Sequence, residues 1–151
     1  MEKALPAERI GFDLSRTARL WRSRLDERLA PLGLTQAKWV ILLHLSKSEG
    51  TLPQRELVDR VGVEGPTLVR LLDGLERLGL IERHDCHADR RTKTIHLTPA
   101  AQPVLENIIR IAGDLRKEIL DGISEEDLVV CLQVFNRMAR NVGAHIGLNP
   151  Q

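Results

Sequence analysis

Residues 51–98 constrain the fold most, because apolar residues follow a helical spacing in the first part of this stretch and a two-residue spacing in the second. The first part predicts two short helices, residues 53–61 and a second helix after a tight turn. On the second helix Leu68, Leu72 and Leu75 recur at spacings of four and three and make one apolar stripe. This pattern is typical of a helix-turn-helix, whose second helix fits the major groove of DNA.

The opposite side of the second predicted helix is polar and carries the first candidate DNA contacts. That side is formed by Thr67, Arg70, Gly74 and Arg77. Pro66 lies in the first turn, where proline costs no hydrogen bond, and Pro66, Thr67 and Arg70 are expected to read the major groove. Arg70 is central and can pair with a guanine edge, although the usual fate of a single helix arginine is solvation. For Arg77 we expect either a phosphate contact or an ion pair with Asp73.

A β-hairpin, or wing, is predicted directly after the second helix. Residues 80–83 and 92–97 are short β-type runs, and apolar and polar residues alternate in the second of them. Three basic residues lie at or beside the hairpin tip: Arg90, Arg91 and Lys93. Their long cationic side chains can reach a phosphate or a narrow minor groove. Thr98 is predicted to cap the next helix, with Pro99 in its first turn.

Net charge by itself does not indicate a nucleic-acid partner. The whole chain has a formal net charge of +1, and residues 54–96 contain eight Lys or Arg and eight Asp or Glu. The argument for DNA therefore rests on where the cations lie, on one helix face and at the hairpin tip. We expect modest non-specific affinity and a steep loss of binding with salt where the arginines engage.

Several strings in the chain match one known pattern. They are LERLGLIER at residues 75–83, DRR at 89–91 and IHLT at 95–98, with LWR at 20–22 and LTQAKWV at 34–40 upstream. In this order they resemble the MarR family of winged-helix regulators over nearly the whole chain. The strings PTLVR at 66–70 and RHDC at 83–86 resemble its SlyA branch in particular.

The resemblance implies a role for individual residues. In the family, the aspartate of the wing motif orients an arginine that enters the minor groove, which by resemblance assigns these roles to Asp89 and Arg91. Arg70 corresponds to the major-groove arginine, and Arg90 and Lys93 are expected to contact the DNA backbone. The resemblance also implies one MarR-type domain over residues 1–151, with the winged helix-turn-helix in residues 35–98.

The two ends of the chain predict further amphipathic helices outside this DNA-reading part. Apolar residues recur at helical spacing in residues 10–32, in 104–119 and in a last helix that begins at Ser124. A shorter helix is predicted from an N-cap at Thr35 to about Ser46. The overall prediction is a mainly α (α+β) fold, with residues 1–34 and 99–151 forming a helical dimerisation part. An isologous homodimer covers the apolar stripes most simply, and an intramolecular bundle is the alternative.

Trp21, Arg22 and Trp39 are candidate effector-binding residues. They are expected to line a crevice between the dimer base and the reading head. By resemblance to SlyA-type and MarR proteins, Arg22 would meet the carboxylate of a small aromatic acid and Trp39 its ring. The chain departs from the SlyA pattern at Ala37 and at His44, which lies one position out of step. The alternative is that both tryptophans belong to the core.

A second function class follows from His84, Cys86 and His87, which lie close enough in the wing to suggest a metal or redox sensor. A structural zinc site is almost always four-coordinate, and no second ligand cluster lies nearby, so we predict no bound metal. No other cofactor is predicted either. Cys86 and Cys131 are far apart and do not suggest a disulfide framework. Cys131, at helical spacing with apolar residues, is expected in the core.

Composition and motif content bound the remaining classes. Apolar residues make up 42% of the chain and aromatic residues only 3%, so the core is expected to be helical and rich in Leu, Ile and Val. The chain has no run of 18 apolar residues and no signal-peptide pattern, which predicts a cytoplasmic protein without a membrane partner. It offers no nucleophile–base pair or paired carboxylates, so no catalytic residue is predicted.

Overall fold

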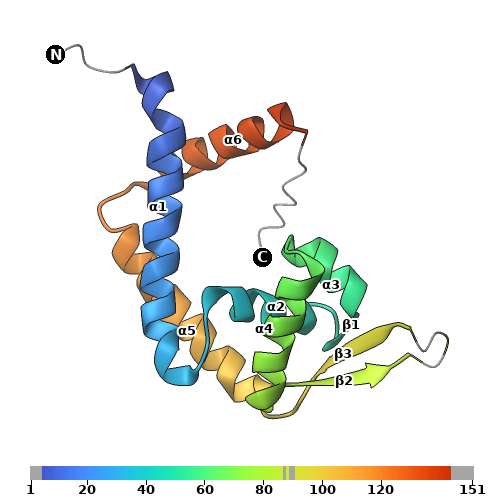
Figure 1. The fold of residues 1–151 in the computed structure, drawn as a ribbon. Coiled ribbons are helices and arrows are strands. Elements are labelled where there is room, and N and C mark those ends of the chain that lie inside the picture. The colour runs from blue at the N-terminus through green and yellow to red at the C-terminus, as the bar shows by residue number, and fades with distance from the viewer. Residues whose placement is uncertain (1–4, 87, 89–90, 144–151) are drawn as a thin grey trace. The chain divides into compact units, whose positions relative to one another are not determined.

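The computed structural model describes residues 5–86, 88 and 91–143. Its elements in chain order are α1 (Pro6–Leu29), η1 (Ala30–Leu32), α2 (Gln36–Ser46), β1 (Thr51–Pro53), α3 (Gln54–Val61), α4 (Gly65–Arg77), β2 (Ile81–Asp85), β3 (Lys93–Leu97), α5 (Ala101–Ile119) and α6 (Glu125–Asn141). They form a mainly helical winged-helix fold with a small antiparallel sheet (Figure 1), which confirms the predicted fold class. The chain divides into two compact units, residues 1–116 and 117–151.

The helix-turn-helix forms because two local signals agree. Gly62 ends α3 in the left-handed conformation, with φ of 71°, which glycine adopts without strain. Pro66 lies in the first turn of α4, where a missing N–H costs nothing. Leu68, Leu72 and Leu75 are fully buried, so the predicted apolar stripe is confirmed as the inner face of α4.

The core is aliphatic, as the low aromatic content predicts. Among the described residues the buried hydrophobic set contains only Leu, Ile and Ala, so the valine part of the prediction is wrong. No charged or polar residue is buried in the part of the chain that the structure describes. Within that part, too, no helix is long and apolar enough to cross a membrane.

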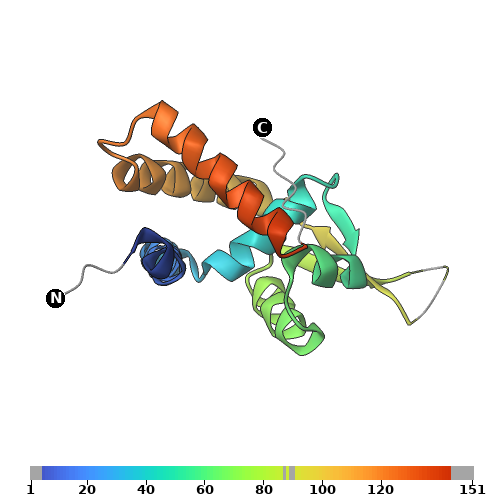
Figure 2. The ribbon, with the colours of Figure 1, turned by 90° about the horizontal axis from the view of Figure 1, so that it is seen from above.

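The sheet has the order β1-β3-β2, and β1 is a strand that the sequence pattern does not predict. Leu52 pairs with Ile95 and is buried, while Pro53 lies in the edge strand, where proline is tolerated. Three residues are too few to show alternation, so only the pairing partner reveals this strand. The β2–β3 hairpin runs outward from α3 and α4, as Figure 2 shows.

Two local predictions in this region are wrong. Gly74 does not lie on the exposed face of α4 but is buried under Lys38: a Cβ at Gly74 would lie 2.9 Å from Lys38 Cε. Thr98 does not cap a helix through its hydroxyl, which donates to the Gly79 carbonyl oxygen at 2.6 Å, and α5 begins only at Ala101. In both cases a residue distant in sequence makes the contact: Lys38 covers Gly74, which the local pattern exposes to solvent, and Gly79 accepts the hydroxyl that the local pattern assigns to a helix cap.

The helices at the two chain ends form as predicted but remain largely uncovered. Ser124 Oγ accepts a hydrogen bond from the Asp127 amide at 3.1 Å and caps α6, as predicted. On α1 only Leu25 and Leu29 are buried. On α6 only Ala139 is buried, so the expected core position of Cys131 is wrong for the single chain, where Cys131 is exposed.

Candidate nucleic-acid interface and effector pocket

The exposed side of α4 carries the side chains that the sequence predicts as major-groove contacts. Pro66, Thr67, Arg70 and Arg77 are all exposed, whereas the leucine stripe of the same helix is buried. Packing of that stripe therefore fixes which way the polar side points. The Nε of Arg77 donates to the backbone oxygen of Asp73 at 3.4 Å, a weak contact within the helix.

The carboxylate of Asp73 pairs with Arg83 rather than with Arg77. Arg83 Nη2 lies 2.7 Å from Asp73 Oδ1, and Arg83 Nε lies 2.5 Å from Glu76 Oε2. One guanidinium group from β2 thus holds two carboxylates on α4. The sequence alone assigned no role to Arg83, because its partners lie on another element, seven and ten positions earlier in the chain.

The wing is a regular antiparallel hairpin whose outer end is charged. The register pairs Asp85 with Lys93, and the amide of Cys86 donates to the Thr92 carbonyl at 2.9 Å. Asp85 and Lys93 form an ion pair in which Lys93 Nζ donates a hydrogen bond to Asp85 Oδ1. This hydrogen bond and the positive charge of the lysine lower the pKa of the Asp85 carboxyl. Lys93, which the sequence predicts as a contact to the DNA backbone, is thus paired with Asp85 in the single chain.

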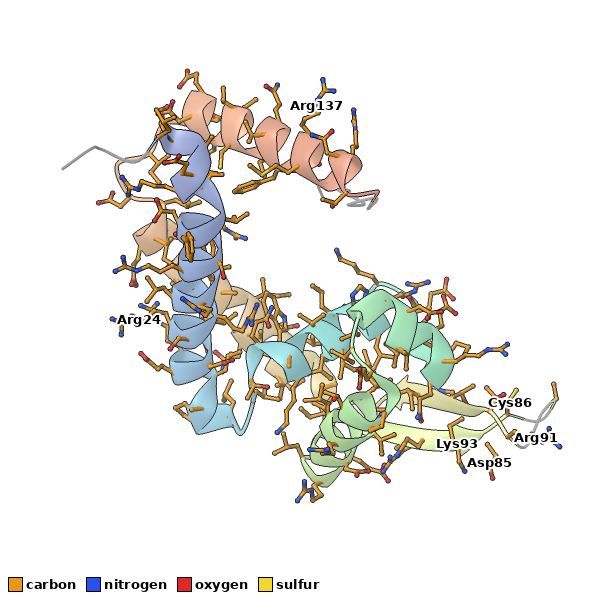
Figure 3. All side chains as sticks on the ribbon, turned by 45° about the horizontal axis from the view of Figure 1, so that its top comes forward. Arg24, Asp85, Cys86, Arg91, Lys93 and Arg137 are labelled. Carbon is orange, nitrogen blue, oxygen red and sulfur yellow. The ribbon has the colours of Figure 1, made fainter. Side chains whose placement is uncertain are left out.

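Arg91 lies exposed at the outer end of the wing, near Asp85, Cys86 and Lys93 (Figure 3). Asp89 and Arg90 lie outside the described residues, as does His87. The predicted orienting role of Asp89 thus concerns a residue whose position the structure does not describe.

The histidines of the wing have partners within the sheet. His84 Nε2 lies 3.0 Å from Glu82 Oε2, and the centre of its ring lies 4.4 Å from that of His96. Both ring nitrogens of His96 lie 3.0 Å from a threonine hydroxyl, one from Thr51 and one from Thr94. Among the described residues no group of three or more His, Cys, Asp or Glu could hold a metal ion.

The structure brings Trp21, Arg22 and Trp39 together around one pocket between α1 and α2. The pocket has a volume of about 340 Å³, and its remaining lining residues are Ala18, Leu25 and Gln36. Asp26 Oδ1 accepts a hydrogen bond from the backbone N–H of Gln36 at 2.5 Å and so connects α1 to the start of α2. The indole Nε1 of Trp39 is buried and has no acceptor among the described residues.

These features define a class of protein, the winged helix-turn-helix proteins. In this one, Arg70 lies on the exposed face of α4 and Arg91 lies on the wing. The sequence model of the MarR family matches residues 32–92. A transcriptional regulator, PA3341, is 48% identical, and the match covers 89% of this chain and 98% of that chain with a TM-score of 0.76. The chain therefore belongs to the MarR family of winged-helix transcriptional regulators.

Two more distant structures share the fold. A MarR variant from E. coli, complexed with operator DNA, is 22% identical; the match covers 85% of this chain and 92% of that chain, with a TM-score of 0.77. The organohalide-sensing transcriptional regulator RdhR in its 2,4-dichlorophenol-bound form is 18% identical, with 91% and 82% coverage and a TM-score of 0.82.

Proposed function

We propose that this protein is a SlyA-like member of its family that binds pseudo-palindromic promoter DNA as a homodimer. The observation that carries the proposal is the exposed face of α4, which presents Thr67 and Arg70 beside a hairpin ending in Arg91. A helix of this kind fits the major groove, and the hairpin arginine fits the adjacent minor groove. The DNA-bound structure of the E. coli variant supports the proposal through its shared fold. Because its target is promoter DNA, we place the protein in the cytoplasm.

Uncovered apolar surface on the end helices supports the dimer. On α1, Phe12 is 82% exposed and Leu20 is 56% exposed. On α6 and at its C-cap the exposed large apolar residues are Val129, Val130, Leu132, Val134 and Val142. Exposed apolar side chains in this number favour an interaction site on the end helices, and a two-fold dimer would cover the same surface on both chains.

Arg91→Ala is the experiment that separates a DNA-reading wing from a sensing wing. If Arg91 enters a narrow minor groove, the substitution weakens binding more on sites with A·T-rich flanks than on G·C-rich ones, because a narrow groove concentrates negative potential. The salt dependence should become shallower by about one unit of log K per log salt, since one cation fewer then displaces counterions from the duplex. Titration of both duplexes at three salt concentrations measures the two effects.

Arg24→Ala is the matched control, because it removes the same charge from an exposed position on α1 that pairs with Glu27 at 3.0 Å. It should leave both duplexes bound as tightly as the parent does. Should Arg91→Ala bind like the parent while Cys86→Ser or a chelator abolishes binding, the wing is a metal or redox sensor. The alternative built on His84, Cys86 and His87 would then replace the DNA-reading role of the wing.

We further propose that a small aromatic carboxylate binds the pocket between α1 and α2 and shifts the spacing of the two heads. Arg22 would pair with the carboxylate and Trp39 would contact the ring. The unpartnered Nε1 donor of Trp39 supports an acceptor-bearing ligand, since a buried donor without an acceptor is unfavourable. The dichlorophenol-bound relative supports an aromatic ligand through its shared fold. Effector action follows if the ligand binds one arrangement of the heads more tightly than the other.

Salicylate is a suitable probe, because the two tryptophans of the chain both line this pocket and their fluorescence reports on it. Saturable quenching is expected, and Arg22→Gln should weaken binding about tenfold or more, as loss of a charge-assisted hydrogen bond does. Arg24→Gln, on the same helix but absent from the pocket lining, should bind like the parent. Equal weakening by both variants would contradict a carboxylate contact at Arg22.

A further inference from the structure

Asp73 lies between Arg70 and Arg77 along the face of α4 that the proposed function turns toward DNA. It follows Arg70 by three positions and precedes Arg77 by four, so the three side chains share one side of α4. A duplex carries about one negative charge per 1.7 Å of its axis. A carboxylate between two arginines would therefore repel the phosphates that those arginines attract, unless a cation cancels its charge.

Arg83 supplies that cation from the base of the wing. Its register partner is Ile95, so Arg83 lies on the same face of the hairpin as the buried Ile81 and Ile95, at the point where the core ends. The guanidinium fork uses two different nitrogens, Nη2 toward Asp73 at 2.7 Å and Nε toward Glu76 at 2.5 Å. The Arg83 side chain is 27% exposed, less than either carboxylate at 46% and 44%. Only arginine has a planar fork of this kind.

We propose that Arg83 is a positioning residue for DNA reading, an inference that rests on the proposed function. It cancels the two carboxylates of α4, and it fixes the angle at which the wing leaves that helix. With this angle fixed, Arg70 and Arg91 reach the major and minor grooves together. In the free protein the ion pairs are half-exposed and contribute little to stability. At the DNA surface water is displaced, and an uncompensated carboxylate becomes costly.

A charge-cancellation series tests the proposal. The probe is a duplex that the parent protein selects from a random-sequence pool, with a shuffled duplex of the same composition beside it. Arg83→Gln should weaken binding to the selected duplex about tenfold to a hundredfold, as expected when one partner of a desolvated charge pair is removed. Adding Asp73→Asn and Glu76→Gln to Arg83→Gln should restore part of the affinity, because no carboxylate then faces the phosphates although the wing angle is no longer held.

Two further variants separate charge from geometry. Arg83→Lys keeps the charge but loses the fork, so its affinity should fall between those of the parent and of Arg83→Gln. Asp73→Asn with Glu76→Gln, in the presence of Arg83, releases a guanidinium group. This variant should bind the shuffled duplex more tightly than the parent does, and the ratio of selected to shuffled affinity should fall.

Two results would overturn the proposal. If the triple variant binds as weakly as Arg83→Gln and the salt slope falls by about one, Arg83 is itself a phosphate contact. If Arg83→Gln lowers the melting temperature and the active fraction, while active molecules keep the parent affinity, its role is only structural. Arg70→Ala in the same assay tests the proposed function separately, since unchanged binding by that variant would reject the reading face itself, whatever Arg83 does.

Discussion

Removal of residues 1–14, or of the chain beyond Ser124, is expected to abolish the soluble dimer. The deleted segments carry exposed apolar side chains, among them Phe12 on α1 and Val142 at the end of α6, both at least 80% exposed in the single chain. Without its complement, the remaining apolar surface of the interface stays in water and favours aggregation. Operator affinity should fall about a hundredfold to ten-thousandfold, because the second head no longer binds as part of the same molecule.

Sedimentation or light scattering measures the oligomeric state, and titration of a selected duplex measures affinity. Phe12→Asp is the milder companion variant, because it keeps the chain length and changes one exposed side chain. It should weaken the dimer in a concentration-dependent manner and leave the helical content unchanged. A truncated protein that stayed soluble, monomeric and cooperatively folded would show that these surfaces do not form the dimer, and would favour an intramolecular bundle.

Arg70→Ala is expected to weaken operator binding by about 1–3 kcal/mol at each half-site, so that the loss occurs twice in a homodimer. Arg70 is exposed at the centre of the α4 face, and a bidentate arginine–guanine pair carries discrimination of that size. The variant should also lose its preference at one base position in each half-site. Titrations on the selected duplex, on its single-base variants and on a scrambled duplex measure both effects.

Arg77→Ala is the matched comparison on the same helix. Because Arg77 lies further along α4 and is the candidate phosphate contact, its removal should weaken binding to the selected and scrambled duplexes by the same factor. An equal fall on both duplexes for Arg70→Ala as well would make Arg70 a phosphate contact. Direct readout by that residue would then be rejected, while DNA binding by the face would stand.

Local periodicity was enough to predict most helices and the wing hairpin. The spacing of Leu68, Leu72 and Leu75 sets the inner face of α4, since helix geometry alone brings residues three and four apart together. N-cap residues such as Thr35 and Ser124 act on amides three positions away, so their role is also readable locally. The exposure of Pro66, Thr67, Arg70 and Arg77 follows from the same geometry, and their contacts with DNA stay a prediction.

Only the tertiary structure decided which residues contact the polar side chains and the small residues. Gly74 is covered by Lys38 from α2, the hydroxyl of Thr98 donates to the Gly79 carbonyl, and β1 exists because β3 lies beside it. Arg83 is the clearest case. Its two carboxylate partners are seven and ten positions earlier on another element. The spacing of residues in the sequence determines which side chains share one face of an element. The packing of elements against one another determines which charged group, hydrogen-bond donor or empty space lies next to each side chain.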